Sequence, residues 1–270
     1  MRAAEWINTL AFTFLTILAW LRALEARRRI TITVLGGAGL GLTAASATLA
    51  PRLLPTLTAS VTRDWLPYLL LLMFYWQAGQ FFTRVDRRAQ SLLEGLDERI
   101  VLGPLAWCAE RRSGRVLLTL LELAYLLCYL SLPAGLAALY IMRRGSQADR
   151  FWSVVLAATY VCYALVPFIQ TKPPRMSAEP GVTLTHSPVR AFNLWILRRA
   201  SIHANTFPSA HVACSMACAL VLLRVSEPVG LVFLLIAICI ALGAVAGRYH
   251  YAADVIFGVA VALAAFVARN

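Results

Sequence analysis

Three short clusters of polar and charged side chains interrupt a sequence that is otherwise largely apolar. They occupy residues 172–175, 205–211 and 248–254, and each lies at one end of a long apolar run. Polar and ionisable groups at membrane depth cost free energy, so clusters of this kind are typical of functional sites. If the apolar runs cross a membrane in turn, all three clusters lie on one side of it. We therefore expect them to form one site.

The last cluster holds a histidine and an aspartate that can act together. His250 and Asp254 are four residues apart, a spacing that places both side chains on one face of a helix. A carboxylate that accepts a hydrogen bond from one ring nitrogen fixes the tautomer and raises the basicity of the other nitrogen. The pair predicts a histidine that acts as a nucleophile or a base. The alternative is that the two side chains only satisfy each other at a helix start.

The middle cluster predicts a helix N-terminus that binds an anion. Pro208 and Ser209 are typical of the first turn of a helix, where free backbone N–H groups and the helix dipole attract negative charge. Phosphate is the expected anion, and His211 in the same turn can protonate a leaving oxygen. The alternative for His211 is a polar side chain that reaches the membrane interface.

The cations near these groups suit a phosphate ester. Arg175 and Arg248 offer planar guanidinium forks that match two phosphate oxygens, and Lys172 offers a point charge. Taken singly, each is more typical of a cation that anchors a membrane span to lipid headgroups. Taken together, two histidines, one aspartate and three cations beside an anion-binding helix start predict phosphoryl transfer through a phosphohistidine.

The rest of the chain must supply the helices that position these residues. Its 270 residues are 60% hydrophobic and 14% charged, against about 45–50% and about 25% in a soluble domain. A bilayer-spanning helix needs about 20 mostly apolar residues. Runs of that order fall at about 4–21, 30–50, 65–83, 116–140, 151–170, 208–225, 229–247 and 250–268. The sequence therefore predicts an all-α, polytopic membrane helix bundle with about eight spans.

The runs divide into an N-terminal pair and a longer core. We expect residues 1–64 to contribute two additional N-terminal spans and residues 65–270 to form a six-span catalytic core. The first run contains Glu5 and Asn8, and its alternative is a cleaved signal sequence, although its basic residues follow the apolar stretch. Seven arginines lie between apolar residues in 84–115, which predicts an interfacial amphipathic helix, with a solvated loop as the alternative.

The charges favour a lipid surface as the partner. The net charge is +12, and all but one of the 25 basic residues are arginine. These arginines punctuate apolar runs, which favours anionic headgroups of a membrane bilayer over nucleic acid. The loops at 22–29, 84–115, 171–207 and 248–249 share one side with the three clusters and contain 17 of the 25 basic residues. The positive-inside rule therefore predicts a cytoplasmic site.

Two of the clusters also resemble motifs of a known family. The string Pro208-Ser209-Ala210-His211 is similar to the P-S-G-H motif of the type 2 phosphatidic acid phosphatase superfamily, and His250-x-x-x-Asp254 is similar to its final H-x-x-x-D motif. The resemblance covers about residues 65–268, in motif order and spacing. It implies a six-helix, phosphatase-like core within the bundle.

The resemblance assigns a role to each matching residue. It implies that His250 is the nucleophile, that Asp254 orients it and that His211 is the general acid. It also implies a phosphate cradle that consists of Lys172, Arg175, Ser209 and Arg248. No metal ion or other cofactor is implied.

The sequence departs from the usual motifs at two places. The family's arginine six residues before the nucleophile is Ala244 here, and Arg248 lies only two residues before His250. The lysine and arginine of the first motif, usually six residues apart, are separated here by two prolines between Lys172 and Arg175. This pattern resembles the branch that includes inositol phosphotransferases of sphingolipid synthesis.

The expected function is therefore that of an integral membrane phosphatase whose substrate is a lipid phosphate or diphosphate. One alternative is a phosphotransferase that moves a phospho-headgroup between a lipid and a hydroxyl acceptor. The other is a non-catalytic lipid transporter. We expect the protein in the cell membrane. The resemblance implies that the site faces the extracytoplasmic side, whereas the charge count predicts the opposite.

Overall fold

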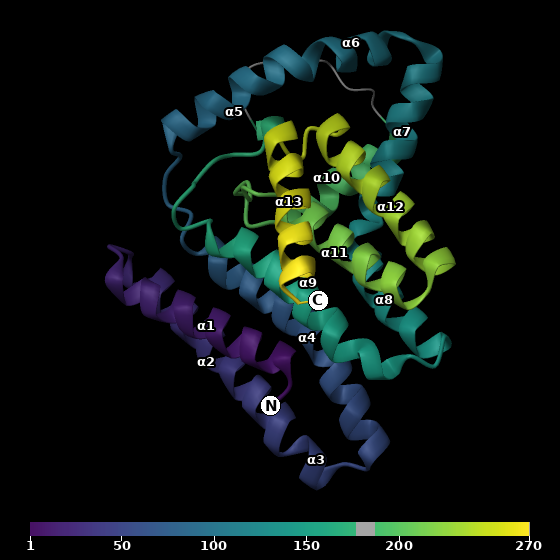
Figure 1. Cartoon of the computed structure of the whole chain (residues 1–270). Coiled ribbons are helices and arrows are strands. Elements are labelled where there is room, and N and C mark those ends of the chain that lie inside the picture. The colour runs from purple at the N-terminus through teal and green to yellow at the C-terminus, as the bar shows by residue number, and fades with distance from the viewer. Residues whose placement is uncertain (177–186, 270) are drawn as a thin grey trace.

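The protein is an assembly of helices. A computed structural model describes residues 1–176 and 187–269, and within these ranges it contains thirteen α-helices, two short 3-10 helices and no strand. The helices form an elongated bundle with shorter helices across one end (Figure 1). This confirms the predicted all-α fold.

Nine long helices account for the eight apolar runs of the sequence. They are α1 (Ala3–Leu21), α2 (Ala26–Thr48), α4 (Thr56–Gly79), α7 (Arg112–Leu126), α8 (Cys128–Ile141), α9 (Ala148–Ala164), α11 (Ala210–Val225), α12 (Glu227–Ala246) and α13 (Ala252–Ala268). The shorter elements are α3 (Ala50–Leu53), α5 (Arg87–Ile100), α6 (Leu102–Glu110), α10 (Pro188–Ala200) and the 3-10 helices Gly145–Gln147 and Pro174–Met176.

Three helices in the described part of the chain, α1, α2 and α12, are each long and apolar enough to cross a membrane. Their length and composition indicate a membrane protein. A fourth span results if α7 and α8 count as one, and α11 and α13 are shorter apolar helices. The number of eight spans therefore stays a prediction.

The run at 116–140, predicted as one span, is broken. Helices α7 and α8 meet at Leu127 with a bend of 55°. Pro133 lies one turn and a half further on, inside α8, where it has no N–H to donate to the carbonyl of Tyr129. The hydroxyl of Tyr68 donates to that carbonyl instead, at 3.0 Å. A neighbouring helix thus satisfies a backbone group that the bent segment leaves free.

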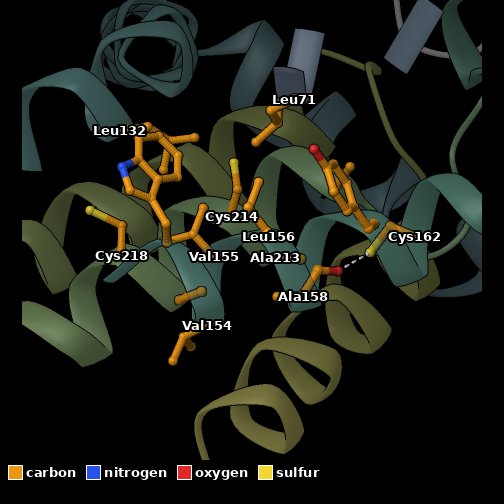
Figure 2. Close-up of a cluster of buried hydrophobic side chains, with 14 of the residues drawn as sticks. Leu71, Leu132, Val154, Val155, Leu156, Ala158, Cys162, Ala213, Cys214 and Cys218 are labelled. Carbon is orange, nitrogen blue, oxygen red and sulfur yellow. Dashed lines mark hydrogen bonds between the residues drawn. The ribbon is translucent and has the colours of Figure 1, made fainter. Parts of the chain in front are cut away.

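Small side chains let the central helices approach closely. Helices α8, α9 and α11 meet in the main core, where Cys162, Cys214 and Cys218 pack among aliphatic side chains (Figure 2). A Cβ atom added to Gly135 would lie 2.5 Å from the Sγ of Cys218, so the contact between α8 and α11 requires a glycine there. Packing of this kind is typical of helices in membranes.

The N-terminal helices α1 and α2 pack against α4 and α9. The rings of Phe12 and Phe74 meet edge to face with centroids 5.5 Å apart, and the hydroxyl of Tyr160 donates to the Oδ1 of Asn8 at 2.6 Å. The amide of Gln77 donates to the carbonyl of Ile32 at 3.1 Å. Buried polar contacts therefore fix the N-terminal pair of helices to the rest of the bundle.

Helices α5 and α6 lie across one end of the bundle, over the end of α12 and the start of α13 (Figure 1). An apolar cluster holds α6 there through Val101 and Leu105, which pack near Val245 and Ala252. The carboxylate of Asp97 in α5 accepts a hydrogen bond from the N–H of Ala252 at 3.0 Å. The segment predicted as an interfacial helix is thus helical and covers the end of the bundle that holds the three polar clusters. Its depth in a membrane stays a prediction.

Candidate active site

Backbone hydrogen bonds join the three polar clusters at one end of the bundle. The N–H of Ser209 donates to the carbonyl of Asp254 at 2.9 Å, which ties the start of α11 to the start of α13. The N–H of Arg175 donates to the carbonyl of Arg248 at 3.0 Å, which ties the first cluster to the last. Clusters that are far apart in the sequence therefore share one rigid frame.

His250 and Asp254 form the predicted pair. The Nδ1 of His250 lies 3.3 Å from the Oδ2 of Asp254, which also accepts the N–H of Tyr251 at 2.9 Å. Both side chains are buried. The predicted face shared by the two side chains requires a helix that has begun at His250, but α13 begins at Ala252, because Asp254, its third residue, caps the N–H of Tyr251. The carboxylate therefore serves the helix start and the histidine at once.

His211 completes a chain of three side chains. Its Nδ1 lies 3.4 Å from the Nε2 of His250, so His250 is placed between Asp254 and His211. Ser209 is the N-cap of α11, and its hydroxyl accepts the N–H of Val212 at 3.5 Å. Pro208 therefore precedes the helix, where the sequence analysis had it in the first turn. The N–H of Ala210 in this turn also has an acceptor, the hydroxyl of Thr206 at 3.4 Å, so the positive end of the helix dipole is what the turn offers to an anion beside His211.

A glycine sets the distance between the two helix starts that carry the histidines. Gly258 lies one turn after Asp254, and a Cβ atom there would lie 2.8 Å from the carbonyl oxygen of Ser209. We expect Gly258→Ala to lower the free energy of unfolding by about 1–3 kcal/mol, because α13 must move away from α11. The matched control is Gly37→Ala in α2, where an added Cβ meets nothing within 4 Å.

The control exchanges the same two residues in open space. It is expected to stabilise the protein by about 0.5–1 kcal/mol, because alanine favours a helix interior. Thermal unfolding of the detergent-solubilised variants measures both. Equal effects of Gly258→Ala and Gly37→Ala would contradict the close approach.

The turn before His250 is held in place by Arg248. This residue has a φ of 60°, in the left-handed region, and the N–H groups of Tyr249 and His250 that follow both donate to the carbonyl of Ala244. The guanidinium of Arg248 forms an ion pair with Asp97 of α5 at 2.8 Å. Burial raises the pKa of Asp97, although the N–H of Ala252 and the charge of Arg248 act against that rise. Asp97 was not predicted as part of the site, since its partner Arg248 lies 151 positions away in the chain.

Arg175 is the predicted cation that combines partial burial with the lack of a carboxylate partner among the described residues. Its guanidinium is partly buried, and burial lowers the pKa of this group. The guanidinium lies close enough to His211 for an electrostatic interaction between the two side chains. Within residues 1–176 and 187–269 no carboxylate pairs with it, and its guanidinium lies 5.9 Å from the centre of the Tyr249 ring. Lys172 is exposed, and its backbone N–H donates to the Oε1 of Gln90 at 2.9 Å. Of the predicted cations, Arg175 is therefore the best placed to meet an anion beside the histidines.

A buried polar cluster that the sequence did not predict lies next to the histidines. Glu122 of α7 accepts hydrogen bonds from Arg190, Asn193 and Tyr249, at 2.5, 2.8 and 2.5 Å. We call these four residues the Glu122 cluster. Glu122 is the one charged residue within the apolar run at 116–140, and that isolation is the signal that could have identified it.

An apolar cavity opens beside His211. Its volume is about 270 Å³, and it lies between helices α4, α8, α9, α10 and α11. Its lining is mostly aliphatic and aromatic and includes Leu71, Leu72, Tyr75, Trp76, Tyr129, Leu132, Tyr163, Ile196, Leu197, His211 and Cys214. A site with a charged phosphate region and an apolar neighbour suits a substrate that has both parts.

The fold and the site together define a helical membrane protein with a His–His–Asp chain and a nearby arginine that has no carboxylate partner among residues 1–176 and 187–269. In the part of the chain that the structure describes, no three His, Cys, Asp or Glu side chains gather as metal ligands would. The profile of the PAP2 superfamily matches residues 91–268, about two thirds of the chain, and the protein belongs to this superfamily. Membership supports a phosphatase-type function. No curated protein and no solved structure matched the chain in the same comparisons.

Proposed function

We propose that this protein is an integral membrane phosphatase that hydrolyses a lipid phosphate or diphosphate through a phosphohistidine. The observation that carries the proposal is the chain from Asp254 through His250 to His211, which ends at an apolar cavity. Each ring nitrogen of His250 has a different neighbour, a carboxylate at Nδ1 and an imidazole at Nε2. This arrangement suits a nucleophile with an acid beside it.

The proposed reaction has two steps. In the first, the Nε2 lone pair of His250 attacks phosphorus, the bond from phosphorus to the lipid oxygen breaks, and His211 gives its proton to that oxygen. Asp254 accepts the Nδ1–H hydrogen bond and stabilises the positive charge that develops on the ring. In the second step His211 takes a proton from water, the oxygen of the resulting hydroxide attacks phosphorus, and the bond between phosphorus and the Nε2 of His250 breaks. The products are inorganic phosphate and the lipid alcohol, or a lipid monophosphate from a diphosphate.

The charges around the site have distinct parts in this proposal. Arg175 and the N-terminal turn of α11 at Ser209 bind the phosphate oxygens, where negative charge develops in the transition state. Arg248, held by Asp97, adds a second guanidinium at the turn of the nucleophile, and Lys172 attracts anions at the exposed rim. The proposed reaction needs no metal ion, so the assays below contain a chelator.

The cavity beside His211 is proposed to hold the apolar chain of the substrate. Ile196→Trp would fill part of it from α10. Each methylene that stays in water costs about 0.8 kcal/mol, so losing two of them should raise the KM for a lipid substrate about tenfold. Hydrolysis of a short, water-soluble phosphate ester should not change. Val232→Trp, on an exposed face of α12, is the control and should leave both values unchanged.

A panel of substrates tests the reaction itself. Phosphatidate, phosphatidylglycerophosphate and a polyprenyl diphosphate, each with labelled phosphate, are offered to the detergent-solubilised protein. Label recovered as free phosphate supports hydrolysis, and label recovered in a new ester on an added polyol supports transfer instead. No turnover of any member, with the protein still folded, would overturn the proposal. An equal rise in KM for lipid and soluble esters in Ile196→Trp would contradict the role of the cavity.

We further propose that the site faces the outside of the cell membrane, as the family resemblance implies. Two arginines at this end, Arg190 and Arg248, pair with the buried carboxylates of Glu122 and Asp97. An arginine that is paired with a buried carboxylate has a structural role, so it is weaker evidence for the membrane orientation of the protein than an unpaired arginine in a loop. A cysteine at the exposed position of Arg99 in α5 should therefore react with an impermeant maleimide added to intact cells. Reaction only after permeabilisation would place the site in the cytoplasm.

A further inference from the structure

The Glu122 cluster connects helices α7 and α10 to the turn between α12 and His250. Its carboxylate is buried and forms an ion pair with Arg190, whose guanidinium also donates to the carbonyl of Gly247 at 3.2 Å. The amide of Asn193 donates to the carboxylate and to the backbone carbonyl of Glu122, at 2.8 and 2.9 Å. One carboxylate therefore joins α7, α10 and the turn that follows α12. A buried charge with this many partners is costly to disturb.

Tyr249 carries this arrangement to both histidines. It is the chain neighbour of His250, and its ring stacks on Tyr125 with centroids 4.2 Å apart and an angle of 14°. The ring of Tyr125 lies 5.8 Å from that of His211, centre to centre. Burial and the nearby Glu122 carboxylate raise the pKa of Tyr249, so its phenol stays protonated and donates to Glu122. The orientation of the Tyr249 ring thus affects the turn that holds His250 and, through Tyr125, the packing beside His211.

We propose that Glu122 is a positioning residue for the reaction, which acts through Tyr249 to hold the two histidines at their working distance. This inference rests on the proposed function. The hydrogen-bond partners of Glu122 in the described part of the chain are Arg190, Asn193 and Tyr249, and it does not line the cavity that we assign to the substrate. Its effect is therefore expected in the chemical step, since a small misplacement of reacting groups lowers kcat, while substrate binding stays nearly unchanged.

Tyr249→Phe is the sharpest test, because it removes a single hydroxyl and keeps the ring. We expect kcat to fall about tenfold, with KM changed by less than about twofold. The matched control is Tyr160→Phe, which also removes a buried hydroxyl from a hydrogen bond of 2.6 Å to a side-chain acceptor, here Asn8. The control should lose a similar amount of thermal stability and keep kcat.

A second pair of variants separates positioning from folding. Glu122→Ala removes both side-chain acceptor atoms, whereas Glu122→Gln keeps an amide oxygen that can accept the hydroxyl of Tyr249. We expect Glu122→Gln to recover most of the kcat that Glu122→Ala loses. A purely structural role would instead make kcat per folded molecule equal in both, as measured after correction for the folded fraction by size-exclusion chromatography.

The outcomes distinguish the two proposals. If the wild-type protein turns over a phosphate ester and Tyr249→Phe has the same kcat, the positioning role is overturned and the proposed function stands. A change in the KM of Tyr249→Phe without a fall in its kcat also overturns the positioning role. So does a fall of kcat in Tyr160→Phe that equals the fall in Tyr249→Phe. Absence of wild-type turnover on every phosphate ester overturns the proposed function, and the positioning role with it. A selective loss of kcat in Tyr249→Phe, restored in part in Glu122→Gln, supports it.

Discussion

His250→Asn is expected to reduce phosphate release at least about 10⁴-fold, because it removes the nucleophile on which both steps depend. The loss should be the same for every leaving group, since no phosphorus–nitrogen bond can form. The measurement is labelled phosphate released from the best lipid of the panel. The same experiment, quenched in base, should trap labelled phosphohistidine on the wild-type protein and none on the variant.

The control for this variant is another histidine at the same end of the bundle. His203 is exposed and has a φ of 57°, a region that asparagine also tolerates, so His203→Asn should fold and retain full activity. Full activity of His250→Asn would overturn the mechanism. So would covalent label that survives on His250→Asn at the wild-type level, because the phosphoryl group would then reside on another residue.

The sequence predicted that His250 and Asp254 lie close together, because the signals for this contact are local. Asp254 meets His250 at 3.3 Å as it caps the start of α13, and Ser209 caps the start of α11, so both contacts join residues at most four positions apart even though His250 precedes its helix. The meeting of the clusters followed from the order of the apolar runs. Local spacing and the alternation of spans therefore carried the prediction of where the polar residues gather.

The missing parts are contacts between distant segments. Asp97 meets Arg248 across 151 positions, and Glu122 meets Tyr249 across 127. The spacing of the residues does not predict the partner of either carboxylate, because the packing of α5 and α7 on the bundle determines which side chains each carboxylate meets. The break at Leu127 is also tertiary, since a hydroxyl from α4 supplies the donor that the bent segment lacks. Isolation of a charge in an apolar run marks such residues, but it does not name the partner.

His211→Asn is expected to separate the two chemical steps. With a lipid ester, turnover should fall about 10²–10⁴-fold, because no acid protonates the poor leaving alkoxide. A nitrophenyl phosphate needs no such acid, so the variant should still transfer its phosphoryl group to His250. Without a base for the water, the second step then stalls. We expect a burst of about one nitrophenol per protein, followed by slow turnover and by accumulation of the labelled phosphohistidine.

The burst decides which role His211 has, because the two histidines should differ in it. His250→Asn should give no burst with either ester, whereas His211→Asn should give one with the activated ester alone. The geometry that supports this division is the distance of 3.4 Å between the Nδ1 of His211 and the Nε2 of His250, which places the acid next to the attacking atom. Equal losses on both esters, with no burst, would mean that His211 only holds His250 in place.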